Sequence, residues 1–108
     1  MRLPLDEFVP SRLRRSLASH DVNTVIDMGW SGVKNGRLLA LAAADFDAFI
    51  TVDKNMPYQQ NLASLPISVV LLDALSNELT ALLPLVPNLE RALSSLTPRT
   101  YVRVEAGA

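Results

Sequence analysis

The sequence predicts an α/β fold in which a mostly parallel sheet of about four or five strands is flanked by helices. Short apolar runs rich in β-branched residues recur along the chain, and stretches with helical spacing of leucine and alanine lie between them. The links between these segments are short, which favours a parallel sheet with helical crossovers. With 108 residues the chain has the length of a single domain, residues 1–108, with one core.

Five segments have the composition of strands. Residues 48–52 are β-branched and aromatic, and residues 67–72 are almost continuously apolar, as is typical of strands buried on both faces. The other three candidates are shorter or more polar, and they are residues 3–5, 23–28 and 99–104.

Four helical segments are expected between these strands. Asn35 is a suitable N-cap for the second of them. Pro84 and Pro87 interrupt the helical pattern before the last strand, so this connection is expected to consist of two pieces. The four segments are residues 11–19, 35–44, 77–83 and 86–96.

The composition argues against several classes of function. Ten basic and eleven acidic residues leave the chain nearly neutral, which disfavours bulk electrostatic binding of nucleic acid but permits a local basic site. There is no cysteine and only one histidine, His20, so disulfides, thiolate sites and histidine-rich zinc sites are excluded. No apolar run approaches the roughly 18 residues of a membrane span, and the N-terminus does not resemble a signal peptide. We expect a cytoplasmic protein of a bacterium or archaeon, with no membrane partner.

The strongest functional signal is a set of acidic residues that follow predicted strands. Asp6 and Glu7 come after the first strand, Asp53 after the central strand and Asp73 after the next. Ligands of open parallel sheets bind where the carboxyl ends of the strands meet. Carboxylates grouped there suit Mg²⁺ or Mn²⁺, which activate water and stabilise charge on a scissile phosphate, as in metal-dependent nucleases. The alternative is that these aspartates only cap helices or form turns.

Two further features have two interpretations each. The arginines of the first helix form either a solvated face or a patch that contacts phosphate, and they are Arg12, Arg14 and Arg15. Trp30, in a loop between two glycines, either stacks on a base or packs on the rim of the domain.

Three segments resemble the small PIN-like domain family. Residues 3–10, LPLDEFVP, are similar to the LLDENLP opening of these domains, and residues 29–40, GWSGVKNGRLLA, to their GW-x-G-x-x-(D/N)-G-E-L-L segment. Residues 51–61, TVDKNMPYQQN, are similar to T-x-D-(R/K)-N-x-P-Y-Q-Q-N, which is long enough to be quite specific. The resemblance covers nearly the whole chain and implies a three-layer PIN-like fold. Many PIN domains are Mg²⁺-dependent ribonucleases that act as toxins of bacterial toxin–antitoxin pairs, as in the VapC-like group.

The resemblance implies the following metal site. Asp6 matches the first metal-binding acid of the family and Asp53 the acid after the central strand, so both are expected to bind Mg²⁺ or Mn²⁺ and to be catalytic. Arg37 stands where the pattern has a glutamate, and Asn55 where many relatives have an aspartate. Two of about four acids are therefore in place, with additional help expected from the acidic residues Glu7 and Asp73.

Substrate contacts are expected from neighbouring polar residues. Arg37 repels a cation but, together with Lys54, can hold an RNA phosphate. Asn55 and Gln59 are expected to orient water or substrate. The leucine-rich residues 71–96 form either ordinary core or an exposed stripe that makes a homodimer or accepts an antitoxin segment.

Three functions compete on this basis. The first is a metal-dependent ribonuclease toxin with an RNA substrate and a cognate antitoxin protein as partner. The second is a PIN-like module that binds RNA or a protein without cleavage, which the missing acids support. The third is a receiver-like phosphoryl-transfer domain, which also uses strand-end aspartates but gains no support from the PYQQN segment.

Overall fold

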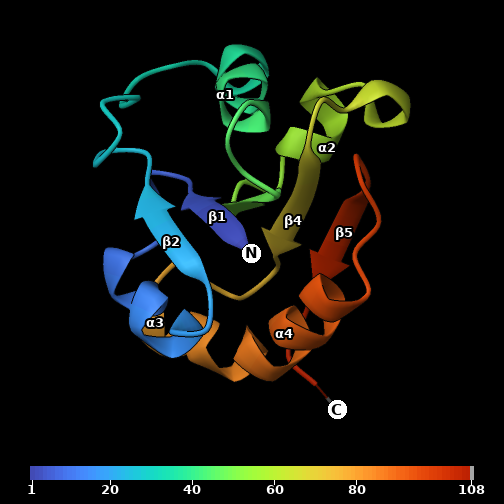
Figure 1. Cartoon of the computed structure of the whole chain (residues 1–108). Helices are drawn as coiled ribbons and strands as arrows, with labels where there is room; N and C mark the ends of the chain where they lie inside the picture. The colour runs from blue at the N-terminus through green and yellow to red at the C-terminus, as the bar shows by residue number, and fades with distance from the viewer. Residues whose placement is uncertain (108) are drawn as a thin grey trace.

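The five strands form one fully parallel sheet in the order β2-β1-β3-β4-β5 (Figure 1). The computed structural model describes residues 1–107. It confirms the predicted α/β class, with a mostly parallel sheet flanked by helices, and is consistent with a PIN-like three-layer arrangement. The strands are β1 (Arg2–Leu5), β2 (Asp21–Thr24), β3 (Ala48–Thr51), β4 (Ser68–Leu72) and β5 (Tyr101–Val104).

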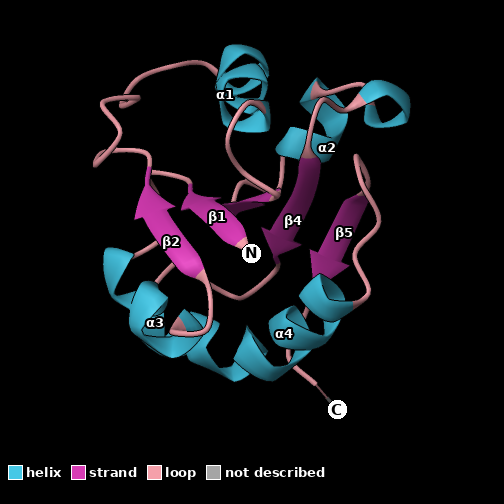
Figure 2. Cartoon of the chain, in the orientation of Figure 1, coloured by secondary structure: helices cyan, strands magenta, loops and turns pink. Residues whose placement is uncertain are grey.

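Helices cover both faces of the sheet (Figure 2). The first face carries η1 and the segment α3–η3–α4, whereas the second carries α1 and α2, the latter followed by the short η2. No helix of residues 1–107 combines the length and apolar character needed to cross a bilayer. The helices are η1 (Ser11–Leu17), α1 (Asn35–Ala43), α2 (Met56–Gln59), η2 (Leu62–Ser64), α3 (Leu79–Leu82), η3 (Leu83–Leu85) and α4 (Val86–Ser94).

The central strands are buried on both faces, as their apolar sequences predict. Successive strand residues point to opposite faces, so Ile50 of β3 packs in the cluster under η1 and α4, while Phe49 packs under α1. Every residue of β3 and β4 is buried. The leucine-rich residues 71–96 are ordinary core for the most part, although Leu75 is fully exposed.

One crossover has the opposite hand to the other three. The connection from β1 to β2 runs over the first face toward the β2 edge of the sheet. The connections from β2 to β3 and from β3 to β4 run over the second face toward the β5 edge. Because both the direction and the face are reversed, all three connections have the same hand. The connection from β4 to β5 also advances toward the β5 edge but runs over the first face. It therefore breaks the strong preference for one crossover hand, and it places α3 against η1.

Some predicted boundaries are wrong. β2 ends at Thr24 instead of running to residue 28, because the Asp27 N–H donates to Thr24 Oγ1 (3.0 Å) and the Thr24 N–H donates to Asp27 Oδ2 (3.4 Å). This exchange folds the chain into a turn, which continues through Gly29 with φ of 74°. Asn35 is the first residue of α1 rather than its N-cap, which is Lys34.

The two helical pieces expected around Pro84 and Pro87 are present as α3 and α4, and the short η3 joins them. α3, η3 and α4 follow one another without a break from residue 79 to residue 94. Pro84 and Pro87 each lie in the first turn of a new helical segment, η3 and α4 respectively. A proline is tolerated there because its missing N–H would have had no partner within the helix.

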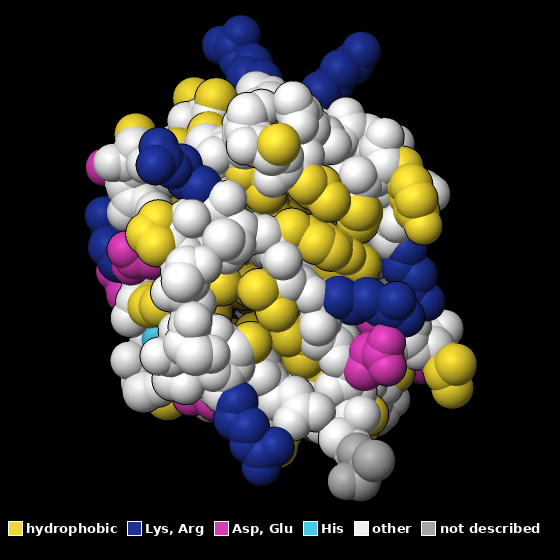
Figure 3. Space-filling model, turned by 90° about the vertical axis from the view of Figure 1, so that its right-hand side faces the viewer, with side chains coloured by type: hydrophobic (Ala, Val, Ile, Leu, Met, Phe, Trp, Pro, Cys, Tyr) yellow, Lys and Arg dark blue, Asp and Glu magenta, His cyan; other side chains and the backbone are white. Residues whose placement is uncertain are grey.

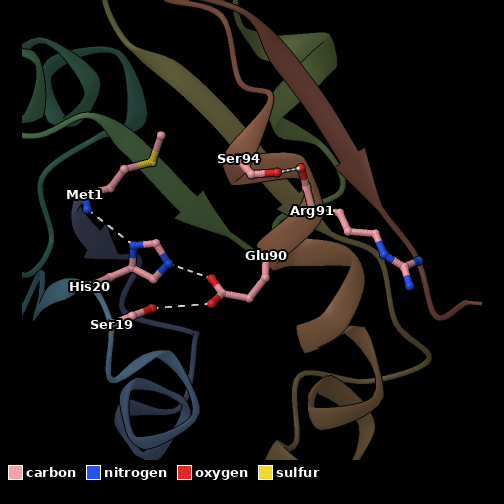
Figure 4. A network of polar contacts seen from close by, with 6 residues as sticks. All are labelled: Met1, Ser19, His20, Glu90, Arg91 and Ser94. Atoms are coloured by element: carbon pink, nitrogen blue, oxygen red, sulfur yellow. Dashed lines mark hydrogen bonds and ion pairs between the residues drawn. The ribbon is translucent and has the colours of Figure 1, made fainter.

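A polar network ties the N-terminus to α4 (Figure 4). His20, in the link between η1 and β2, contacts the N-terminal amine of Met1 through Nδ1 (3.3 Å) and Glu90 of α4 through Nε2. Ser19 donates to the other carboxylate oxygen of Glu90 (3.4 Å). The side chain of His20 is only 14% exposed, so this pair is better shielded than the other ion pairs on the surface.

We expect Glu90→Ala to lower the free energy of unfolding by about 1 kcal/mol, because a half-buried hydrogen-bonded pair is lost along with a link between distant segments. Glu105→Ala is the matched control, since Glu105 forms an ion pair with Arg103 in which both side chains are more than half exposed. Denaturant unfolding at neutral pH measures both. Equal effects of the two variants would contradict a structural role of the network.

Candidate functional site

The two aspartates singled out by the sequence lie together at the carboxyl edge of the sheet. Asp6 follows β1 and Asp53 follows β3, and these two strands are direct neighbours. The chain leaves β1 toward β2 on one side and leaves β3 toward β4 on the other, so this point is the topological switch of the sheet. Ligands of open α/β sheets bind in the crevice at such a point.

The Thr51 hydroxyl joins the two aspartates. It donates to Asp6 Oδ2 (2.9 Å) and accepts the backbone N–H of Asp53 (3.1 Å). Thr51 is completely buried and Asp6 is only 6% exposed, so the hydroxyl sets the position of both acids from beneath the site. The Glu7 N–H completes the support by donating to Asp6 Oδ1 (2.9 Å).

The surroundings of Asp6 disfavour its negative charge. Burial raises the pKa of the Asp6 carboxyl, and the hydrogen bonds from Thr51 and from the Glu7 N–H only partly oppose this effect. The nearby charges of Glu7 and Asp53 raise the pKa further. A cation bound at this point would relieve both the desolvation and the repulsion.

Asp53 is held by local bonds and by α1. Its Oδ1 accepts the N–H of Asn55 (2.9 Å), and this bond closes a turn that leads the chain into α2. Its Oδ2 accepts a bond from the Asn35 side-chain amide (3.4 Å), which also donates to Gln59 Oε1 (3.3 Å). Asn35 therefore brings Asp53 and Gln59 together, and the side chain of Asn55 is exposed beside them.

Two open cavities flank the acids. One of about 420 Å³ is lined by Asp6 and Glu7, with Arg14 and Asp27 in its wall. The other, of about 500 Å³, is lined by residues that include Glu7, Asp53, Asn35 and Gln59. Glu7 lies between the two, where its carboxylate accepts a bond from Ser31 (3.2 Å). Glu7 is therefore reached from both cavities, whereas Asp6 lines only the first and Asp53 only the second.

The predicted basic contacts are placed differently. Lys54 pairs with Asp73 (3.1 Å) and donates to the carbonyl of Ala74 (2.9 Å), which directs it to the ends of β4 and β5. Asp73 is also paired with Arg103, and the bond from Lys54, with the support of Arg103, lowers the pKa of its carboxyl. Arg37 is exposed on α1 and makes no ion pair within residues 1–107. Neither Lys54 nor Arg37 lines the two cavities.

Two other side chains are explained by the structure. Arg14, one of the three arginines of the first helix, forms an ion pair with Asp27 (3.1 Å) in the wall of the cavity beside Asp6. Trp30 packs edge-to-face on Phe46, with ring centroids 6.1 Å apart, which favours packing on the rim of the domain over base stacking.

The oxygen donors fit a weakly held, hydrated Mg²⁺ or Mn²⁺ ion. Within residues 1–107 no group of three or more histidine or acidic side chains is arranged to hold a metal. Mg²⁺, however, is commonly bound by one or two carboxylates while it keeps several waters and contacts substrate phosphates. Asp6 and Asp53 are such a pair, and Asp6 has both oxygens fixed by hydrogen bonds.

Sequence reasoning missed two residues of the site. Thr51 is the first residue of the T-x-D segment, so the motif contained it, but its hydroxyl was not assigned a role. Asn35 occupies the (D/N) position of the second segment, so the motif contained it too, but the sequence predicts only a helix cap there and not a contact with Asp53. Comparisons of the chain with protein-family models, curated proteins and solved structures give no match. The PIN-like family therefore stays a prediction that rests on the three sequence segments.

Proposed function

We propose that the protein is a Mg²⁺- or Mn²⁺-dependent ribonuclease whose metal ligands are Asp6 and Asp53. The observation that carries this proposal is the buried Asp6 carboxyl, which lies beside a second aspartate at the topological switch of the sheet and lines an open cavity. Burial and the neighbouring acids disfavour this charge and the two hydrogen bonds to Asp6 offset them only in part, so a bound cation would stabilise the folded state further.

The residues of the chain have distinct roles in this proposal. Asp6 and Asp53 would hold a divalent ion, which when bound would supply positive charge near the scissile phosphate and lower the pKa of a water molecule. Thr51 and the Glu7 N–H hold Asp6 in place, and Asn35 orients Asp53. The Glu7 carboxylate, which lines both cavities, accepts a proton from the attacking water. Lys54 lies outside both cavities, whereas Arg14, although paired with Asp27, lines the cavity beside Asp6, so we assign the contact with RNA phosphate to Arg14.

Calorimetric titration with Mn²⁺ tests the metal site directly. We expect the wild type to bind in the millimolar range or tighter and Asp53→Ala to bind at least about tenfold more weakly. Asp73→Ala is the matched control, because Asp73 also ends a strand but is occupied by Lys54 and Arg103. No Mn²⁺ binding by the wild type, or an equal loss in both variants, would contradict the proposal.

The second candidate is a module that binds RNA or a partner protein without cleaving. It is favoured by the exposed Arg37 on α1 and because, within residues 1–107, no three acidic or histidine side chains are arranged to hold a metal. It predicts RNA binding that persists in EDTA, measured by fluorescence anisotropy, and no cleavage in Mn²⁺. The first candidate predicts cleavage that EDTA abolishes.

The resemblance extends the first candidate to a cytoplasmic toxin with a cognate antitoxin. Induced expression of the wild type in a bacterial host is then expected to arrest growth, and Asp53→Ala is expected to relieve this arrest. Growth arrest that is unchanged in the variant would separate toxicity from the metal site.

A further inference from the structure

The outer edge of β5 presents unused backbone hydrogen-bonding groups. β5 pairs with β4 on one side only, and on that side the carbonyls of Thr100 and Val104 accept N–H groups from the β4 segment (2.9 and 2.8 Å). Backbone groups of successive strand residues point to opposite sides. Tyr101 and Arg103 therefore direct their N–H and C=O groups outward, where no backbone partner within residues 1–107 receives them.

The side chains at this edge are partly apolar. Figure 3 shows the side of the molecule that carries β5, with hydrophobic side chains gathered in a shallow hollow and charged side chains at its rim. Tyr101 and Val102 are half-buried, one on each face of the sheet. A cavity of about 420 Å³ adjoins the strand where α4 contributes Asn88 and Ala92. β5 contains no proline, which would block pairing at an edge.

We propose that β5 pairs antiparallel with the β5 of a second copy of this chain, about a two-fold axis at Val102. In this register the two Val102 side chains face each other, and Tyr101 of each copy faces Arg103 of the other. The sheet then continues from one copy into the next, and the interface is isologous, as is usual for homodimers. This inference does not depend on the proposed nuclease function.

Backbone geometry supports this register. In an antiparallel ladder the two residues of a hydrogen-bonded pair exchange both of their N–H···O=C bonds. Tyr101 and Arg103 carry the outward groups, so the two Tyr101–Arg103 pairs use every free group of the strand. The N–H and C=O groups of Val102 already bond to β4, so Val102 can occupy only a non-hydrogen-bonded position of the new ladder, which is the position at the axis.

Charge selects this register over its neighbours. Arg103 is paired with Asp73 and Glu105 of its own chain, but a shift that centres the axis on Arg103 still sets two guanidinium groups face to face. A shift that centres it on Tyr101 sets Arg103 opposite Arg99. Like charges directly opposite each other are destabilising, whereas an aromatic ring facing an arginine is favourable. A shift by one residue would put side chains on the wrong faces. The strand is therefore complementary to itself in one register, which favours a second copy as its partner.

Cysteine cross-linking tests both the interface and its register. The chain has no native cysteine, so each variant carries a single thiol. At the non-hydrogen-bonded position the two Cα atoms of residue 102 would be about 4.5 Å apart, within reach of a disulfide. The two Cα atoms of residue 103 would be diagonal neighbours about 7–8 Å apart, which is too far. Val102→Cys is the test variant and Arg103→Cys its matched control.

We expect the wild type to be a dimer by sedimentation velocity and light scattering, and Val102→Cys, but not Arg103→Cys, to form a covalent dimer under mild oxidation. Val102→Lys should raise the dimer dissociation constant at least about tenfold, because two ammonium groups would meet at the axis. A wild type that is monomeric up to about 100 μM overturns the proposal. Cross-linking of Arg103→Cys alone overturns the register, and a dimer in which neither variant cross-links overturns the interface.

Discussion

Asp6→Asn is expected to abolish metal-dependent cleavage and, at neutral pH, to make the protein more stable. Asparagine has the shape of aspartate and can still accept the Glu7 N–H and bond to Thr51, so the fold is preserved. It cannot neutralise a cation, so Mn²⁺ affinity and cleavage should each fall by about 10²-fold or more. Because the buried charge disappears, we expect a gain of about 1 kcal/mol, or a rise of roughly 4–8 °C in Tm.

The stability gain should depend on pH in a defined direction. Folding raises the pKa of Asp6 above its ordinary value of 3.8, chiefly through burial. The folded state therefore binds this proton more tightly than the unfolded state. The contribution of the wild-type carboxyl to stability is greatest below pH 3.8 and falls as the pH rises through the folded-state pKa. The difference in Tm between Asp6→Asn and wild type should thus be largest at neutral pH and shrink toward pH 3.8.

Asp73→Asn is the matched control for this prediction. Lys54 and then Arg103 lower the pKa of Asp73, so removal of its charge should not stabilise the protein at neutral pH and should leave Mn²⁺ binding unchanged. Thermal unfolding and calorimetry on the two variants give a direct comparison. If Asp6→Asn lost activity but also lost stability at neutral pH, its carboxylate would be satisfied by the fold, and the argument for a bound cation would fail.

The sheet was predictable because its central strands carry a strong signal. Residues 48–52 and 67–72 are so continuously apolar that only burial on both faces accounts for them, and the structure places β3 and β4 there. The boundary of β2 was not predictable in this way. Its apolar run continues past Thr24, but the bonds that Thr24 exchanges with Asp27 compete locally with the strand and end it.

The site was predictable in position but not in its contacts. An acid that directly follows a strand of a parallel sheet must lie at the carboxyl edge, so Asp6 and Asp53 could be assigned to the same edge from the sequence, but their closeness depends on β1 and β3 being neighbours. The partner of Lys54 could not be predicted, because it depends on where β4 and β5 end relative to β3. The same holds for Asn35, whose amide reaches Asp53 across the gap between α1 and the sheet. Contacts between distant segments leave no local pattern in the sequence.

Thr51→Val is expected to produce the second large effect, on stability and on metal binding together. Valine keeps the shape of threonine but removes the hydroxyl, which leaves Asp6 Oδ2 without its donor and the Asp53 N–H without its acceptor. A buried polar group without a partner costs about 1–3 kcal/mol. The Thr51 bond is also the strongest influence that lowers the Asp6 pKa, so its loss should raise that pKa further. Mn²⁺ binding should then weaken and require a higher pH.

Thr51→Ser separates the hydroxyl from the methyl group. Serine keeps the bridge between the two aspartates and loses only one buried methyl group, so its cost should stay near 1 kcal/mol and the pH profile of Mn²⁺ binding should match wild type. The informative quantity is the pH midpoint of Mn²⁺ binding. If Thr51 had only a structural role, Thr51→Val and Thr51→Ser would both lower stability and leave this midpoint unchanged. A shift in Thr51→Val alone identifies the hydroxyl as a positioning group for both acids. Equal midpoints in the two variants would mean that each aspartate is held by its other partners.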